Sequence, residues 1–336
     1  MFAIPKVLSI TCNHSFRENP EPVFTCPKMV LRRFADYLLT PNGKRVCFGL
    51  AFTAGAVVFN AGFMPNTFFL DNYRDVVRLY KDGLSVPLPE ELKVEFDKAI
   101  TLVGIGKEER KMFQPFTVFG FDTFHAGLSF SKFGSIIGIP INFTYKDIDS
   151  IDKTLIKVRH DSVPWGTEEA TQLLESFILS ENAQIYAIAR EIKTADSAKS
   201  MLDIVYKTLG VLGCYSLSNL INTKLNLYIR PRGMRVALYV LVTAFMYGNY
   251  CFFKDFTQIY YEQYVDEFLK NKDPIFAEGG KEYYEKILQR NKALRKLLGR
   301  EGENRFSSLG NENFFIRQRH VPLLHRKQFF EENLVN

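Results

Sequence analysis

The stretch that decides the class of this protein runs from Val46 to Leu70 and reads VCFGLAFTAGAVVFNAGFMPNTFFL. Its 25 residues include no charged side chain. About 20 consecutive apolar residues are enough to cross the hydrocarbon core of a bilayer as a helix. The stretch starts too late in the chain, and is too long, for an ordinary secretory signal. We therefore expect a membrane-spanning helix over residues 46–70.

Two further apolar stretches follow much later in the chain. Residues 236–253 (VALYVLVTAFMYGNYCFF) contain no charge over 18 residues. Residues 208–223 number only 16, but the flanking Lys207 and Lys224 can lengthen this span by extending toward the headgroups. The alternative is a buried helical hairpin in a soluble core, and we favour the membrane because one span is already expected. The sequence thus predicts three membrane-spanning helices.

Three spans divide the rest of the chain between the two sides of the membrane. Residues 1–45 and the loop 224–235 fall on one side, and residues 71–207 and 254–336 fall on the other. The loop contains four basic residues and no acidic one. Basic residues prefer the side from which a membrane protein inserts, which in a mitochondrion is the matrix. The charge bias favours that side for residues 1–45 and the loop.

Composition and short motifs argue against several classes of function. The net charge is +6, and no block of like charge resembles a nucleic-acid-binding tail. The five cysteines have no zinc-binding spacing, and we interpret them as free thiols. No two histidines are four residues apart, and no Gly-rich phosphate loop or nucleophile elbow is present. We expect no nucleic-acid partner, no cofactor and no metal ion.

The amino-acid composition of the segment after the first span changes along its length. Residues 71–112 look helical, with an interruption at the proline-rich VPLPEEL. Residues 116–145 are rich in Phe, Ile, Val and Thr and are broken by Gly and Asp. This pattern is typical of short strands and hairpins. We expect the second stretch to form a small sheet.

Two long amphipathic helices complete the expected soluble part. The first covers residues 167–193, with Thr167 as its N-cap and two glutamates in its first turn. The second covers residues 281–298 and ends at a glycine. The sequence therefore predicts an α+β membrane protein with a helix-rich soluble domain that contains a small sheet. The C-terminal part, residues 254–336, is expected to pack on residues 71–207.

A glutamate interrupts the apolar face of the first of these helices. Between Phe177 and Ile185, the apolar positions of the helix are occupied by Glu181 and Gln184. Burying a carboxylate is unfavourable by several kcal/mol unless it is paired. An ion pair or a groove open to water would satisfy Glu181. The other explanation is an inherited active-site position.

Several distinctive stretches occur in a fixed order along the chain. They are VPLPEELKVEFDKAITLVGI, PFTVFGFDTFHAGLSF, GSIIGIPINF, LSENAQIYAIARE and EGGKEYYEKILQRNKALRKLLGREGE, followed by RHVP. Together with the three spans they resemble the transmembrane protein 177 family from about Lys44 to Lys327. The resemblance implies residence in the mitochondrial inner membrane and a role in cytochrome c oxidase biogenesis. It also implies association with newly made subunit II and the small inner-membrane chaperone of that subunit, and it attaches no catalytic activity.

The layout is also similar to that of integral-membrane zinc peptidases of the prenyl-protein-processing and heat-shock type. Those enzymes place H-E-x-x-H on a helix after a strand hairpin, and a third ligand in E-x-x-x-D after a membrane hairpin. On this alignment Ser180 and Gln184 replace the two histidines, and Glu181 matches the general base. Glu262 matches the third ligand and Asp266 the residue that follows it. Because serine and glutamine are poor zinc ligands, the likeness implies a degenerate metallopeptidase-like scaffold with vestigial active-site positions.

These features support three hypotheses about function. The leading one is a non-enzymatic assembly or stability factor for oxidase subunit II. The alternative is a membrane-embedded hydrolase with an unusual site, which would contain metal and lose proteolysis on the Glu181→Gln substitution. A transporter or channel ranks last, because three uncharged spans offer little to line a pore.

Overall fold

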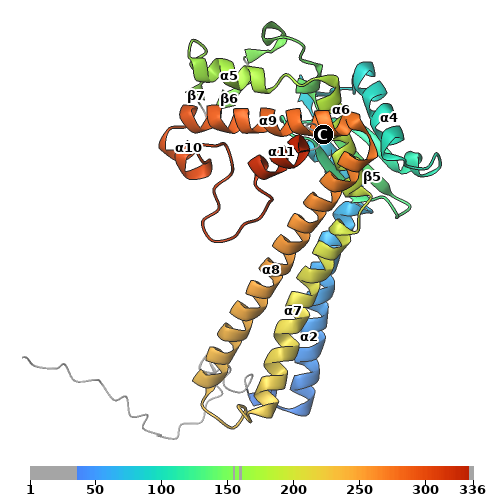
Figure 1. Ribbon diagram of the computed structural model, residues 1–336. Helices are drawn as coiled ribbons and strands as arrows, with labels where there is room; N and C mark the ends of the chain where they lie inside the picture. Colours follow the sequence, from blue (N-terminus) through green and yellow to red (C-terminus); the bar gives the residue numbers. More distant parts are fainter. Residues whose placement is uncertain (1–35, 154–155, 159–160, 333–336) are drawn as a thin grey trace, which may run out of the picture. The chain divides into compact units, whose positions relative to one another are not determined.

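The computed structural model describes residues 36–153, 156–158 and 161–332. Within these residues it contains three helices that are long and apolar enough to cross a membrane (Figure 1). They are α2 (Pro41–Phe63), α7 (Lys199–Lys224) and α8 (Arg232–Lys272). The predictions of three spans and of an α+β membrane protein are both confirmed.

The ends of these helices differ from the predicted spans. Helix α2 starts before residue 46 and ends at Phe63, where Pro65 follows in a 3-10 turn, η1 (Met64–Asn66). Helix α7 starts at Lys199 instead of residue 208. Helix α8 continues past residue 253 for a total of 41 residues, or about 60 Å at 1.5 Å per residue. A bilayer core needs only about half of that length, so α8 also forms part of the soluble domain.

Glycines allow the membrane helices to approach one another closely. The chain divides into two units inside α2, after Gly49, and the contacts described here belong to the second unit. A Cβ atom placed on Gly55 of α2 would lie 2.7 Å from Leu212 Cδ2 of α7. One on Gly213 of α7 would lie 2.4 Å from Met246 Cε of α8. Small residues at such positions are typical of packed membrane helices.

The predicted small sheet is confirmed. Strands β3 (Phe113–Val118), β4 (Phe124–Leu128) and β5 (Gly134–Pro140) form a three-stranded sheet in the order β3-β5-β4. Strand β5 pairs in parallel with β3 and antiparallel with β4. Every residue of β5 is buried, as expected for a central strand that is covered on both faces.

The stretch predicted to be mainly helical after the first span also contains a hairpin. Helices α3 (Leu70–Val77) and α4 (Glu90–Val103) flank the short strands β1 (Tyr80–Lys81) and β2 (Leu84–Ser85). The turn between the strands is Asp82–Gly83, and both residues have positive φ. Asp-Gly between two short strands is a strong hairpin signal, and the helical prediction overlooked it.

The helix predicted over residues 167–193 is two helices. Helix α5 (Glu168–Ser176) begins at the predicted N-cap Thr167, whose side chain accepts a hydrogen bond from Ala170 N. Helix α6 (Glu181–Ala195) begins after a separate N-cap, Ser180. The prediction of one continuous helix is therefore wrong. Because of the break, Glu181 is the first residue of α6 and does not lie in the middle of a longer helix.

The C-terminal part folds back on the rest of the soluble domain. Helix α9 (Pro274–Leu297) extends the predicted helix at its N-terminal end and packs along α5, α6, α8 and α11. The remaining elements are α10 (Arg300–Arg305), α11 (Leu323–Glu331), the 3-10 turns η2 (Glu109–Met112), η3 (Ile141–Thr144) and η4 (Ile148–Ser150), and the paired strands β6 (Lys157–Val158) and β7 (Asp161–Ser162).

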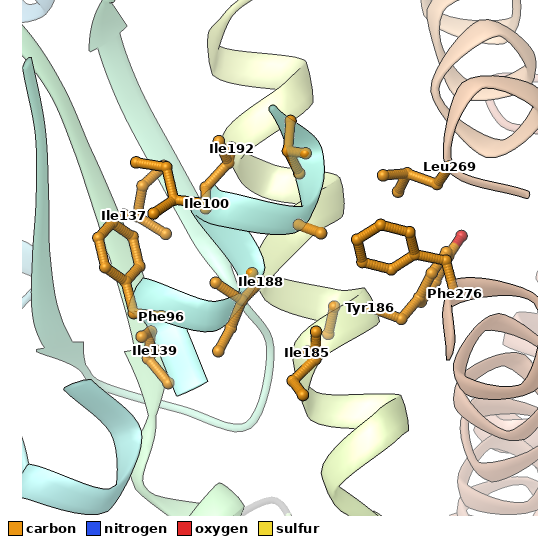
Figure 2. Packing of buried hydrophobic residues seen from close by; sticks show 14 of the residues in the cluster. Phe96, Ile100, Ile137, Ile139, Ile185, Tyr186, Ile188, Ile192, Leu269 and Phe276 are labelled. Atoms are coloured by element: carbon orange, nitrogen blue, oxygen red, sulfur yellow. The ribbon is translucent and has the colours of Figure 1, made fainter. Parts of the chain in front are cut away.

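Helix α6 lies at the centre of the main hydrophobic core. Figure 2 shows α4 and β5 on one side of this helix and residues of α8 and α9 on the other. Nearly every residue from Ala183 to Ala189 is fully buried. A helix that is buried around its whole circumference is typical of the interior of a domain. Polar side chains in the middle of α6 therefore lie among residues of the neighbouring elements and not in solvent.

Candidate functional site

Ser180 and Glu181 lie at the N-terminal end of α6, on the surface of the domain. The Ser180 hydroxyl accepts a hydrogen bond from Ala183 N at 3.3 Å. Ser180 also donates its backbone N–H and its hydroxyl to the carboxylate of Glu282 on α9. Glu181 accepts a hydrogen bond from Lys98 Nζ at 2.7 Å, and 62% of its side chain is exposed. The ion-pair explanation for Glu181 therefore applies, since Glu181 pairs with a lysine at the exposed edge of a groove.

Gln184 lies one turn further along α6 and is buried. Its Nε2 donates to the carbonyl oxygen of Leu179 at 3.0 Å. Its Oε1 has no hydrogen-bond partner among the residues that the structure describes. Ser180, Glu181 and Gln184 line an open groove between α4, α6 and α9, which we call the α4–α6 groove.

Glu262 and Asp266 lie elsewhere, on the part of α8 that extends beyond the apolar span. Asp266 is buried and accepts hydrogen bonds from Arg326 Nε at 2.6 Å and Nη2 at 2.8 Å. It also accepts from the hydroxyls of Tyr186 and Tyr284, at 2.7 and 3.0 Å. The five positions were predicted to share one cleft. The structure instead places Ser180, Glu181 and Gln184 in one groove, and Glu262 and Asp266 at a separate place on α8.

The residues of α6 that meet this part of α8 come later in the helix than the alignment placed them. Tyr186 donates to Asp266, and Arg190, one turn further on, lines the same cavity as Glu262. Tyr186 and Arg190 are thus the two residues of α6, four apart, that lie near Glu262 and Asp266. The alignment had assigned this role to Ser180 and Gln184. Neither side chain is a usual zinc ligand.

A cavity of about 370 Å³ is enclosed by β4, α6, α8, α9 and the segment before α11. On its α6 side, Glu191 is buried and accepts hydrogen bonds from Arg190 Nη2 at 2.6 Å and Thr123 Oγ1 at 3.0 Å. The His125 ring also contacts the Glu191 carboxylate. Burial alone would raise the pKa of Glu191, but Arg190 and His125 outweigh it and lower that pKa far below 4.5. Glu191 is therefore a carboxylate held by neighbouring donors.

The C-terminal segment, residues 317–326, binds along one side of α8, where a series of acidic residues accepts hydrogen bonds from it. Asp255 accepts two hydrogen bonds from Arg317, at 2.8 and 3.0 Å. Further along α8, Glu262 accepts from Val321 N at 2.9 Å, and the His320 ring lies 2.6 Å away. Together with the Asp266–Arg326 pair, these contacts hold the segment against α8, where it forms part of the cavity wall.

The three carboxylates of this arrangement are all paired. Glu191, Glu262 and Asp266 each contact a cationic or histidine side chain at hydrogen-bonding distance. Within residues 36–153, 156–158 and 161–332, no group of three His, Cys, Asp or Glu side chains is placed to hold a metal ion. The network connects α6 to α8, α9 and α11.

Sequence reasoning missed most of the residues that build this network. Glu191 and Arg326 are buried and Arg190 is half-buried, whereas a charged residue on a helix is usually predicted to face solvent. The burial of Glu191 could have been predicted, because α6 is apolar on every side around it. Arg326 had no comparable signal, since its partner Asp266 is 60 residues away in the sequence.

The match to known sequences covers this network. The sequence profile of transmembrane protein 177 matches residues 120–326, which is well over half of the chain. The chain belongs to the transmembrane protein 177 family. Transmembrane protein 177 of Rattus norvegicus is 29% identical over 250 residues, covering 74% of this chain and 79% of the relative. The Homo sapiens relative is 27% identical with the same coverage of each chain, and that of Danio rerio is 27% identical over 76% of this chain and 82% of its own.

Membership of the transmembrane protein 177 family and the three spans make this chain a multi-pass membrane protein. The matched region begins after β3 and ends at Arg326, so it contains the residues of the cavity on β4, α6, α8 and α9. Helices α2 and α4 fall outside it. No solved structure matches the chain.

One residue of the α4–α6 groove gives a pH-dependent prediction for this family member. Burial, with the nearby charges of Glu181 and Glu91, raises the pKa of Glu95 from 4.5 to about 7. Between these values the folded protein keeps a proton that the unfolded chain releases, so the Glu95 carboxyl lowers stability as the pH rises. Glu95→Gln is expected to raise the unfolding midpoint at pH 8 and to leave it unchanged near pH 4.

Thermal unfolding in detergent at both pH values measures this effect. Glu108→Gln is the control, because Glu108 is an exposed carboxylate that pairs with Lys111. A Glu95→Gln variant with the same midpoint as Glu108→Gln at pH 8 would contradict the assigned pKa.

Proposed function

We propose that this member of the family is a non-enzymatic assembly and stability factor in the mitochondrial inner membrane. In this role it holds newly made cytochrome c oxidase subunit II together with the small inner-membrane chaperone of that subunit. The compartment and the client are those that the family resemblance implies. The physical support for a holding function comes from one surface of α8.

That surface is a row of exposed aromatic rings at four-residue spacing, which we call the aromatic face. Phe252, Phe256, Tyr260 and Tyr264 are exposed by 65, 60, 54 and 41%. Successive ring centroids lie 6.3, 6.5 and 6.3 Å apart, and the rings stack along the helix. Exposed aromatic residues in a contiguous row are typical of binding surfaces.

The aromatic face begins at the membrane and extends beyond it. Lys254 and Asp255 end the uncharged part of α8, so Phe252 lies at the bilayer boundary. From Phe252 to Tyr264 the helix rises about 18 Å, whereas the headgroup layer on each side of a bilayer is about 5–8 Å thick. Lipid headgroups therefore cover the first rings but not Tyr260 and Tyr264.

A client with membrane helices fits such a surface. A client helix whose apolar side continues past the bilayer would match the aromatic face, which offers an apolar surface with the same continuity. The two phenylalanines lie toward the lipid, and the two tyrosines add hydroxyl groups at the end that faces water. The aromatic face is the single observation that carries the proposed function.

The polar cavity is consistent with a role that needs no chemistry. Its carboxylates are paired with Arg190, Arg326 or histidine and hold the C-terminal segment in place. We therefore propose no catalytic residue, no cofactor and no nucleic-acid partner.

Simultaneous replacement of Phe256 and Tyr260 by alanine tests the proposal. The variant is expected to recover roughly tenfold to thirtyfold less subunit II on affinity purification from mitochondria, the range for loss of a dominant aromatic contact. Phe119→Ala is the matched control, because Phe119 is 74% exposed and lies after β3, away from α8. Equal recovery with the two variants would contradict the proposal, provided that both accumulate to the parent level.

A further inference from the structure

The α4–α6 groove is an open depression of about 800 Å³ that is separate from the polar cavity. Acidic side chains reach it from each helix that borders it: Glu91 and Glu95 from α4, Glu181 from α6 and Glu282 from α9. Its walls also include the apolar Val94, Phe143 and Leu179. A groove with apolar walls and an acidic lining suits a long side chain that ends in a positive charge.

Two acceptor atoms in the groove have no donor. Gln184 is only 6% exposed. Its Oε1 atom has no hydrogen-bond partner in the described part of the chain. Glu95 is half-buried, and its Oε2 atom also has no hydrogen-bond partner among the described residues. Buried acceptors without donors are unfavourable by about 1–3 kcal/mol each. Both atoms belong to residues that line the groove, so a ligand that donates hydrogen bonds would stabilise it.

The lysines around the groove do not supply these donors. Lys98 pairs with Glu181 at 2.7 Å, and Lys146 lies 3.5 Å from Glu91. Lys286 donates to the carbonyl oxygen of Glu175 at 3.0 Å. Glu282 is engaged by Ser180. The positive charges of the groove are thus directed to its rim, while Gln184 and the ionised form of Glu95 remain as acceptors.

We propose that the α4–α6 groove binds a cationic side chain, arginine or lysine, from a segment of a partner protein. The apolar walls contact its methylene groups, and Glu95 and Gln184 accept from its N–H groups. A metal ion fits less well, because no three ligands converge in the described residues and the groove is partly apolar. The site does not depend on the aromatic face or on the identity of the client.

The charge of Glu95 makes this binding depend on pH. Glu95 faces Glu91 and Lys98 on its own helix and Glu181 on α6. A bound cation favours its ionised form, so binding releases a proton and strengthens as the pH rises through about 7.

The experiment uses the full chain in lipid nanodiscs and a fluorescent, acetylated and amidated peptide of alternating leucine and arginine. A peptide with citrulline in place of arginine keeps the shape and removes the charge. At pH 8 the arginine peptide is expected to bind at least about tenfold more tightly than the citrulline peptide, the value of a charge-assisted hydrogen bond. Glu95→Gln and Gln184→Met are each expected to weaken binding, by about tenfold and about threefold.

The controls separate the groove from general surface charge. Glu108→Gln removes an exposed carboxylate away from the groove and is expected to leave binding unchanged. Glu181→Gln, at the exposed rim, provides a second groove variant if Glu95→Gln fails to fold. Equal binding of the two peptides, or equal binding by the Glu95→Gln and Glu108→Gln variants, would overturn the proposal. Saturable binding of Ca²⁺ that requires Glu95, without binding of the arginine peptide, would identify a metal site and overturn it as well.

Discussion

Replacing Arg326 with methionine is expected to lower the free energy of unfolding by about 3–5 kcal/mol, the range for breaking a buried ion pair on one side. Arg326 is buried and donates two hydrogen bonds to Asp266, at 2.6 and 2.8 Å. Methionine keeps much of the volume but leaves the Asp266 carboxylate with only two tyrosine hydroxyls. The buried negative charge would then be uncompensated.

The same substitution is expected to release the C-terminal segment from α8. Denaturant unfolding in detergent, followed by circular dichroism, measures the stability, and limited proteolysis measures the release. Arg319→Met is the control, because Arg319 lies on the same segment and is exposed. A loss below about 1 kcal/mol, or one equal to that of Arg319→Met, would show that the Asp266–Arg326 pair contributes no more than a surface contact.

Gly279→Ala is the second substitution with a large expected effect. A Cβ atom at residue 279 would lie 2.1 Å from the carbonyl oxygen of Asn182, which belongs to the backbone of α6. A backbone atom cannot rotate away, so α9 would have to move off α6. We expect a loss of about 3 kcal/mol, the upper part of the range for overpacking a core, even though alanine favours helix formation.

Gly248→Ala provides the matched control for this prediction. Gly248 is also inside a helix, α8, and a Cβ atom there meets nothing within 4 Å. This variant is expected to unfold like the parent or to be slightly more stable, whereas Gly279→Ala unfolds at a lower denaturant concentration. If both variants had the parent midpoint, the close approach of α6 and α9 would be refuted.

These two predictions also explain the most distinctive stretch of the sequence, EGGKEYYEK. Gly279 admits the backbone of α6, and Gly280 admits the Phe330 ring of α11, which would lie 2.8 Å from an added Cβ. Tyr284 then reaches Asp266. The stretch is therefore a packing element at which three helices meet.

Length and the absence of charge were enough to predict the membrane helices, but not where they end. A helix ends at a local signal, not at the membrane surface. In α8 the first such signal after the span is Asp273–Pro274, so the helix continues into the soluble domain. The region of the sheet was likewise predictable from its Phe, Ile, Val and Thr content, because that pattern is local.

The break between α5 and α6 was not predictable from local sequence. No glycine or proline marks it, and Ser180 is held there by Glu282, which is 102 residues away in the chain. The two groups of candidate residues follow from this break. Glu262 and Asp266 are held by partners from distant segments, which no local pattern predicts. The likeness to zinc peptidases stays a prediction.

Site-specific photo-crosslinking from residue 260 tests the central claim most directly. A photoreactive phenylalanine analogue replaces Tyr260 on the aromatic face, and mitochondria that are translating their own proteins are irradiated. We predict a covalent adduct with newly made oxidase subunit II from position 260 and none from the same analogue at the exposed Phe119. Adducts with lipid alone, or equal protein adducts from the two positions, would contradict the account of α8 as the client-holding surface.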